Sequence, residues 1–114
     1  MHSRTPAEQD RVQGKLVRDL IPEIIRQSGR QPLIYTADVD EYGRRLRLKL
    51  QEEVDEFLEA DSSTSTEELA DILEVVYALA HELGMSPQQL ETVRLYKAAE
   101  RGGFKKRIVW TGNA

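Results

Sequence analysis

Residues 46–83, with the sequence LRLKLQEEVDEFLEADSSTSTEELADILEVVYALAHEL, decide the fold. The first part carries apolar residues at helical spacing, which predicts a helix capped by Asp38 or Asp40 and running to about Ala60. Its apolar stripe consists of Leu46, Leu50, Val54, Phe57 and Leu58. After a turn over residues 61–66, the next helix is apolar nearly all round, and such a helix is usually buried on several sides. In so small a chain, that burial predicts a partner subunit.

A short helix is predicted before this pair. Apolar residues recur at three- and four-residue spacing over residues 16–25, and Pro22 suits the first turn of a helix. Gly29 follows in the position that commonly ends a helix. Two short extended, β-prone segments, near residues 33–36 and 106–110, could pair weakly with each other.

A fourth helix is predicted after Gly84. Ser86 serves as its N-cap, Pro87 takes the first helical position, Gln89 completes a capping box, and the helix runs to about Arg101. The expected fold class is all-α, a four-helix bundle completed by oligomerisation. We expect one domain over residues 14–114, preceded by a flexible N-terminal tail over residues 1–13.

The composition excludes several classes of protein. The chain has 114 residues, which suits one domain. No stretch approaches the roughly 20 apolar residues of a membrane span, and the N-terminus lacks the apolar segment of a signal peptide, so we expect a cytoplasmic protein. The absence of cysteine excludes disulfides, thiol nucleophiles and zinc sites of the cysteine type.

Charge is distributed unevenly along the chain. Between Leu50 and Val93 there are 12 acidic residues and no lysine or arginine, whereas both flanks are basic. The basic flanks could bind phosphate groups or compensate the acidic block itself. The acidic centre argues against a protein that binds nucleic acid.

Four carboxylates are expected to face one another. Glu53 and Glu56 are neighbours on one edge of the first helix's apolar stripe, and Glu68 and Asp71 border apolar residues on the next helix. An antiparallel hairpin would bring all four together, which is unfavourable unless protons or cations neutralise them. Oxygen ligands without cysteine or histidine select hard cations such as Mg²⁺ or Mn²⁺.

Simpler roles for the same residues stay open at this point. Glu68 could complete a capping box with Ser65, and Glu53 is well spaced to pair with Lys49 four residues earlier. The remaining acids could line solvated helix faces.

The paired acidic motifs resemble a known superfamily. Residues 51–56 (QEEVDE) and 68–74 (ELADILE) are similar to the Glu-Glu-x-x-Glu and Glu-x-x-Asp signature of the all-α nucleoside triphosphate pyrophosphohydrolases, which include MazG-like and phosphoribosyl-ATP pyrophosphohydrolase-like proteins. Residues 15–25 and 97–104 also look like parts of a small single-domain branch of that group. The resemblance implies a MazG-like bundle and hydrolysis of a nucleoside triphosphate between the α and β phosphates.

The resemblance also implies roles for individual residues. Glu53, Glu56, Glu68 and Asp71 match the Mg²⁺ ligands, and Glu52 matches the accessory carboxylate of the doubled glutamate. Glu52, Glu53 and Glu56 are thus the expected catalytic residues, with Glu52 or Glu56 able to accept the proton of an attacking water.

Basic residues on the flanks are candidates for contacting substrate phosphates. Lys97 and Arg101 share one helix face, Lys15 and Arg18 are similarly spaced, and Lys49 precedes the acidic motif. Charge compensation across the bundle or capping of a helix C-terminus is the alternative role for Lys97 and Arg101.

The expected partners are a nucleotide substrate and further copies of the chain, as a homodimer or homotetramer, with no membrane and no nucleic acid. The favoured function is a Mg²⁺-dependent pyrophosphohydrolase that clears surplus or non-standard nucleotides, with Mn²⁺ as a possible substitute. The alternative is a catalytically silent helical module for dimerisation or nucleotide sensing.

Overall fold

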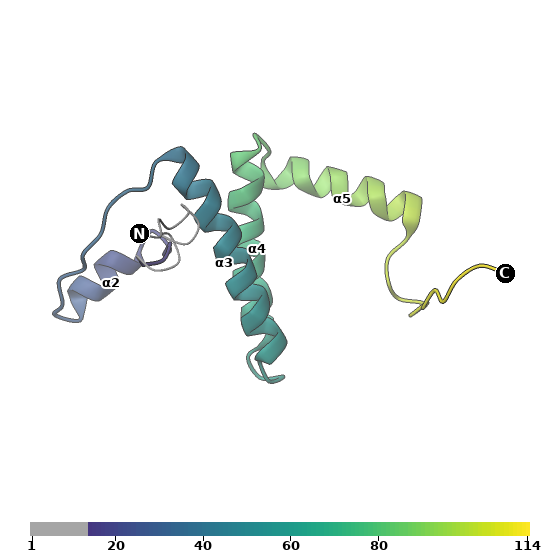
Figure 1. Cartoon of the computed structure of the whole chain (residues 1–114), viewed down its shortest axis with the longest axis horizontal. Helices are drawn as coiled ribbons and strands as arrows, with labels where there is room; N and C mark the ends of the chain where they lie inside the picture. The colour runs from purple at the N-terminus through teal and green to yellow at the C-terminus, as the bar shows by residue number, and fades with distance from the viewer. Residues whose placement is uncertain (1–13) are drawn as a thin grey trace, which may run out of the picture.

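A computed structural model of the chain describes residues 14–114 and places four helices there. They are α2 (Ile21–Gln27), α3 (Val39–Glu59), α4 (Ser65–Glu82) and α5 (Pro87–Arg101), as labelled in Figure 1. This part of the chain contains no strand, so the all-α fold class is confirmed. The predicted tail over residues 1–13 lies outside the described residues.

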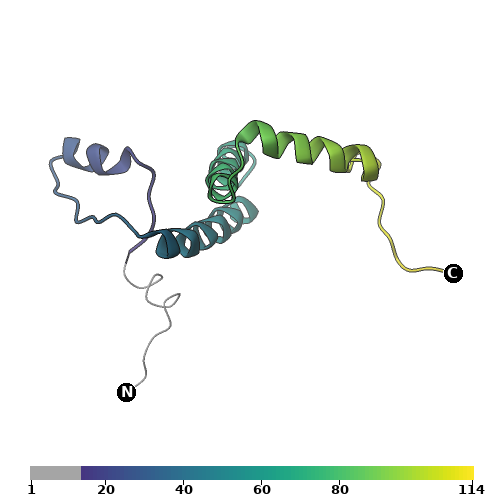
Figure 2. The ribbon, with the colours of Figure 1, turned by 90° about the horizontal axis from the view of Figure 1, so that it is seen from above.

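Helices α3 and α4 form an antiparallel hairpin at the centre of the molecule and lie side by side (Figure 1, Figure 2). The Asp38 carboxylate accepts a hydrogen bond of 2.9 Å from the backbone N–H of Glu41, so the predicted N-cap is confirmed. The turn after Ala60 is held by Asp61, whose carboxylate accepts a hydrogen bond of 2.9 Å from the backbone N–H of Ser63. These local contacts fix where α3 begins and where the turn between the two helices lies.

The core within one chain is thin. Among the described residues, the buried hydrophobic side chains are those of Leu46, Val75 and Ala80, and all three lie on the hairpin. Arg45 and Glu53 of α3 are also buried, which is uncommon for charged residues without partners. Within residues 14–114 the hairpin is therefore the best-packed part, and it contains the predicted acidic motifs.

Helix α5 turns away from the end of α4. Gly84 has a φ of 79° and its N–H donates a hydrogen bond to the carbonyl of His81, which ends α4 in a conformation that favours glycine. The predicted capping box is confirmed: Gln89 N–H donates to the Ser86 hydroxyl at 3.1 Å, and Ser86 N–H donates to the Gln89 side chain at 2.8 Å. Beyond this junction α5 points away from the hairpin (Figure 1).

The molecule is extended rather than round. Its radius of gyration is 18.4 Å, whereas a compact chain of this length would have about 13 Å. Many large hydrophobic side chains are exposed, and several of them follow α5 in sequence. No helix within residues 14–114 is both long and apolar enough to cross a membrane.

Two local predictions were wrong. The segments near residues 33–36 and 106–110 do not pair, because the first lies in the α2–α3 connection and the second lies beyond α5 on the other side of the hairpin (Figure 1). The predicted turn over residues 61–66 is also shorter, since α4 begins at Ser65 and its N-cap position is taken by Thr64. The Ser65 hydroxyl donates to the carbonyl of Asp61 at 2.7 Å, so Glu68 does not form a capping box with it.

Candidate active site

The hairpin brings together three of the four predicted carboxylates. Glu53 and Glu56 come from α3, Glu68 comes from α4, and one carboxylate oxygen of each lies within 4.8 Å of the others. The i, i+3 spacing puts the two α3 residues on one face, and the antiparallel packing of α4 adds the third. Glu53 is buried, Glu68 is half-buried and Glu56 is exposed. We call these three residues the carboxylate cluster.

Two oxygens of the carboxylate cluster lack a hydrogen-bond partner. Oε2 of Glu53 and Oε2 of Glu68 are both buried and unpaired, and an unsatisfied buried acceptor is costly, more so when it is charged. Burial raises the pKa of Glu53, and repulsion by Glu56 acts in the same direction, while the contact with Lys49 opposes both. Three converging carboxylates with two unpaired oxygens have the chemistry that fits a hard divalent cation.

Lys49 lies beside the carboxylate cluster on α3. Its Nζ is 3.3 Å from Oε1 of Glu53 and 3.8 Å from Oε1 of Glu52. Lys15 approaches Glu52 from the segment before α2, at 3.9 Å. The predicted pairing of Lys49 with Glu53 is therefore present, and a second lysine from a distant part of the sequence joins it.

Asp71, the fourth predicted carboxylate, is not part of the carboxylate cluster. It lies one turn after Glu68 on α4, and its Oδ1 accepts a hydrogen bond of 2.7 Å from Nη2 of Arg18. Arg18 is itself a predicted phosphate-binding residue. The structure thus joins a predicted metal ligand to a predicted substrate ligand across 53 residues of sequence.

Comparison with known proteins identifies a family that matches the chain. The family described as phosphoribosyl-ATP pyrophosphohydrolase matches residues 17–93, more than half of the chain. The chain belongs to that family. A protein of Mycolicibacterium smegmatis described as uncharacterized is 56% identical over 48 residues, which is 42% of this chain and 49% of that protein. No solved structure matches the chain.

Two cavities flank the carboxylate cluster of this pyrophosphohydrolase family member. One, of about 550 Å³, lies between the α2 region and the hairpin, and its lining includes Glu53, Asp71, Arg18 and Tyr42. The other, of about 440 Å³, is lined by residues 14–16 and by the outer side of α3, including Glu52 and Glu56. Both volumes fall in the range of small-molecule sites, roughly 300–1,000 Å³.

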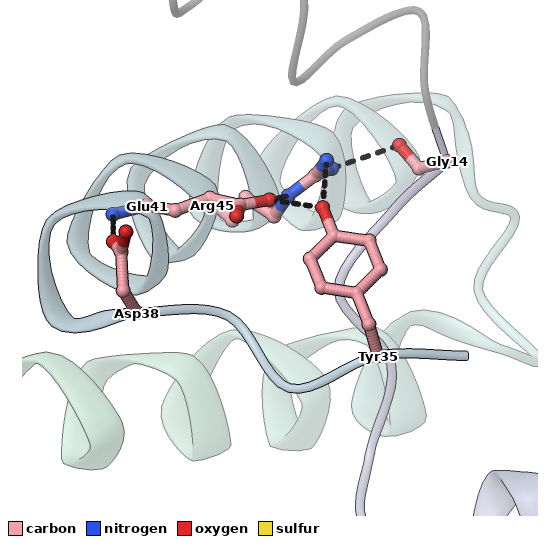
Figure 3. A network of polar contacts seen from close by, with 5 residues as sticks. All are labelled: Gly14, Tyr35, Asp38, Glu41 and Arg45. Atoms are coloured by element: carbon pink, nitrogen blue, oxygen red, sulfur yellow. Dashed lines mark hydrogen bonds and ion pairs between the residues drawn. The ribbon is translucent and has the colours of Figure 1, made fainter.

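A polar network around Arg45 attaches distant segments to α3 (Figure 3). Its Nη1 donates to the carbonyl of Gly14 at 3.0 Å, its Nε donates to Glu41 at 2.6 Å, and its Nη2 donates to the Tyr35 hydroxyl at 3.2 Å. Tyr35 in turn donates a hydrogen bond to Glu41. The network anchors the segment that carries Lys15 and Arg18 against α3, so it positions two predicted site residues.

Sequence reasoning missed this network. Only the spacing of Glu41 and Arg45, which suits an i, i+4 ion pair, gave a local signal. The contacts of Arg45 with Tyr35 and Gly14 join residues 10 and 31 positions apart, and no local pattern marks them.

Lys97 and Arg101, the remaining predicted substrate ligands, are not brought to the carboxylate cluster of their own chain. Both are exposed on α5. Helix α5 joins the end of α4 opposite to Glu68, and it then leads away from the hairpin (Figure 1).

Proposed function

We propose that this protein is a Mg²⁺-dependent nucleoside triphosphate pyrophosphohydrolase that cleaves between the α and β phosphates. The observation that carries the proposal is the carboxylate cluster with its two unpaired buried oxygens, on the hairpin of a pyrophosphohydrolase family member. The products are a nucleoside monophosphate and pyrophosphate. Clearance of surplus or non-standard nucleotides in the cytoplasm is the proposed role.

The proposed metal ligands are Glu53, Glu56 and Glu68, with Asp71 next to them on α4. All donors are carboxylate oxygens, which favours Mg²⁺, with Mn²⁺ as a substitute. A divalent cation held there supplies positive charge for the phosphate oxygens and lowers the pKa of a water molecule. Asp71 can join the ligand set when Arg18 exchanges it for a substrate phosphate, because both are anionic partners for one guanidinium.

The chain's own residues have separate tasks in the proposed reaction. Lys15, Arg18 and Lys49 hold the phosphate groups, since all three cations already lie next to carboxylates at the edge of the site. A water oxygen attacks the α phosphorus, the bond from that phosphorus to the bridging oxygen breaks, and pyrophosphate leaves. The carboxylate of Glu52 accepts the proton of the water.

The larger cavity is the proposed site for the rest of the nucleotide. It contains one aromatic side chain among its lining residues, that of Tyr42, together with apolar residues of the α2 region. An aromatic face and apolar walls suit a base, and the lining of the same cavity includes the charged residues Lys49, Glu53 and Asp71.

Release of pyrophosphate from a nucleotide panel tests the proposal. The panel should contain canonical and modified NTPs, dNTPs and phosphoribosyl-ATP, each with Mg²⁺, with Mn²⁺ and with EDTA. We expect metal-dependent release that Glu53→Gln abolishes and that Glu67→Gln, an exposed neighbour of the cluster on α4, leaves intact. Silence of the folded wild-type protein across the panel would rule the proposal out.

A second candidate is a catalytically silent module for dimerisation or nucleotide sensing, which the thin core and the exposed hydrophobic side chains favour. In such a module Glu53→Gln alters stability, oligomeric state or nucleotide binding, and wild-type protein shows no turnover to lose. The same pair of variants therefore separates the two functions.

A further inference from the structure

The larger cavity, of about 550 Å³, runs along the α3–α4 hairpin. On α3 its lining residues Tyr42, Leu46, Lys49 and Glu53 follow one another at three- and four-residue steps, so they share one face of the helix. Tyr42 precedes Glu53 by 11 residues, which corresponds to about 16 Å along the helix axis. The cavity therefore extends from the carboxylate cluster towards the start of α3, and different residues line its two ends.

Helix α4 gives the cavity the same direction. Because α4 packs antiparallel to α3, its lining residue Asp71 lies towards the carboxylate cluster and its lining residue Ala78 lies towards Tyr42 (Figure 1). The rest of the lining comes from residues 16–21 and from Ile24. We call the part of the cavity around Tyr42 its far end.

Two neighbours in sequence, Arg18 and Asp19, lie towards opposite ends of this cavity. Nη2 of Arg18 donates a hydrogen bond of 2.7 Å to Asp71, on the side of the carboxylate cluster. Burial raises the pKa of Tyr42, and the negative charges of Glu82 and Asp19 act in the same direction, so both carboxylates lie near the phenol ring. Asp19 itself forms no hydrogen bond or ion pair with any residue in 14–114.

The far end thus combines an aromatic ring, apolar side chains and a carboxylate that is available to a ligand. Nucleic-acid bases stack on aromatic rings and are recognised by hydrogen bonds to their Watson–Crick edge. A carboxylate only accepts hydrogen bonds, so it selects an edge that presents N–H donors.

Guanine matches a carboxylate better than the other common bases do. Its ring N1–H and its 2-amino group are adjacent donors, and the two oxygens of one carboxylate can accept from both. Adenine and cytosine place an acceptor nitrogen beside their amino group, and uracil places a carbonyl on each side of its single N–H. In these three bases an acceptor would therefore face the negative charge.

We propose that Asp19 is a specificity-determining residue that selects guanine nucleotides, by accepting hydrogen bonds from N1–H and the 2-amino group while Tyr42 stacks on the base. Residues 18 and 19 then contact the two ends of one nucleotide, Arg18 the phosphates and Asp19 the base. The proposal rests on the proposed function for the place of the phosphates at the carboxylate cluster. Base selection is nevertheless measurable by binding, without turnover.

Glu74 is a second carboxylate in the lining of the cavity, and it provides a matched control. It is exposed and forms no ion pair with any described residue. It lies three residues after Asp71 on α4 and thus before Ala78, which is nearer to the phosphates than the far end is. In a nucleotide the sugar lies between phosphate and base, so Glu74 is placed beside the sugar.

A matched series of purine nucleotides tests the proposal first. In wild-type protein kcat/KM should fall in the order GTP, inosine triphosphate, ATP, because guanine offers two donors, hypoxanthine offers one and adenine offers an acceptor at N1. We expect at least about a tenfold difference between GTP and ATP, which is the size of one hydrogen bond to a charged group. Equal values, or an adenine nucleotide such as phosphoribosyl-ATP that exceeds GTP, overturn the selection by Asp19. Either result leaves metal-dependent pyrophosphate release standing, so this failure is distinct from failure of the proposed function.

A specificity switch tests the residue itself. The side chain of Asp19→Asn carries one acceptor and one donor, which match the N1–H and the 2-carbonyl of xanthine. This variant should lose at least about tenfold in kcat/KM for GTP and gain for xanthosine triphosphate, so that the order of the two nucleotides reverses. Glu74→Gln removes a charge from the same cavity and should keep GTP above xanthosine triphosphate. An equal loss towards all nucleotides in Asp19→Asn, or the same reversal in Glu74→Gln, overturns the proposal.

Calorimetric binding separates base selection from catalysis. If wild-type protein releases no pyrophosphate, titration with GTP, inosine triphosphate and ATP should give dissociation constants that rise in this order. Tyr42→Leu should weaken binding of all three by roughly tenfold, the size of one stacking contact, whereas Tyr42→Phe keeps the ring and should bind as wild type does. Equal binding of the three nucleotides, no binding at all, or an unchanged affinity in Tyr42→Leu overturns the proposal.

Discussion

The α3–α4 hairpin and the C-terminal arm, residues 93–110, differ in the burial of their apolar residues and in the sign of their charge. In the hairpin, Leu46, Val75 and Ala80 are buried, and the charged residues Glu53 and Arg45 are buried with close partners. In the arm the apolar residues are exposed and five bases have no partner among the described residues. Residues 51–92 carry 12 acidic residues and no lysine or arginine, whereas the arm has six bases and one acid, so the two regions have charge of opposite sign. The contrast shows that the carboxylates of the hairpin contact the cations Lys15, Arg18 and Lys49 of their own chain and not the bases of the arm.

The largest difference between the two regions should appear in stability. Leu46→Ala removes a 3% exposed side chain from the hairpin core and should cost about 2–5 kcal/mol of unfolding free energy. Val109→Ala in the arm should cost less than about 0.5 kcal/mol in dilute protein, because surface substitutions usually do. Urea unfolding at two protein concentrations measures both. The contrast fails if the two variants lose similar stability at the lower concentration.

Divalent cations should stabilise the hairpin and leave the arm unaffected. With Mn²⁺ at 100 times its dissociation constant, binding to the folded state alone adds about 2.7 kcal/mol. Thermal unfolding with Mn²⁺, Mg²⁺ and EDTA measures this gain in wild-type protein. Glu53→Gln should abolish it, since this substitution removes a buried charged ligand, while Glu67→Gln should retain it. An equal rise in both variants would place the cation elsewhere.

Local sequence signals predicted the hairpin and the N-caps of α3 and α5 well. Asp38, Ser86 and Gln89 act within three residues of their hydrogen-bond partners, so their roles follow from short patterns. The convergence of Glu53, Glu56 and Glu68 followed from helical spacing plus one antiparallel turn. Asp71 does not converge with these three residues, because its carboxylate contacts Arg18 instead, and its role as a metal ligand stays a prediction.

Contacts between segments that are distant in sequence could not be predicted from local patterns. The hydrogen bonds from Arg18 to Asp71 and from Arg45 to Gly14 depend on how the segment before α2 returns to the hairpin, and no periodicity encodes that path. The expected strand pairing was wrong for a related reason. Residues 33–36 and 106–110 have β propensity, but a strand also needs a partner within reach, and these segments lie on opposite sides of the hairpin.

The Ser86 N-cap should contribute strongly to the stability of α5, because this helix has few contacts with the rest of the chain. Ser86→Ala removes the hydroxyl that accepts from Gln89 N–H and should cost about 1 kcal/mol. Because α5 packs on α4 only near its start, the loss should appear as fraying of α5, visible as faster hydrogen exchange over residues 87–101 with the hairpin unchanged. Ser62→Ala, in the turn of the hairpin, is the control. Exchange that accelerates equally in α3 would show that α5 and the hairpin unfold together.

The smallest expected effect is a change of folding stability at acidic pH. It depends on the Arg45 network, which attaches the segment before α2 to the hairpin. The hydrogen bond from Tyr35 holds the pKa of Glu41 below its ordinary value, and Arg45 adds to this. A carboxyl group with a lowered pKa in the folded state contributes stability above its unfolded pKa of about 4.3, and that contribution disappears as the pH falls through the folded pKa. Wild-type protein should therefore be more stable than Glu41→Gln at pH 6, and the difference should shrink steadily towards pH 3. Urea unfolding across that range measures it, with Glu67→Gln as the control for loss of an exposed charge. A difference that stays constant with pH would mean that Glu41 acts through packing, and that the attachment of Gly14 and Lys15 to the hairpin does not depend on its charge.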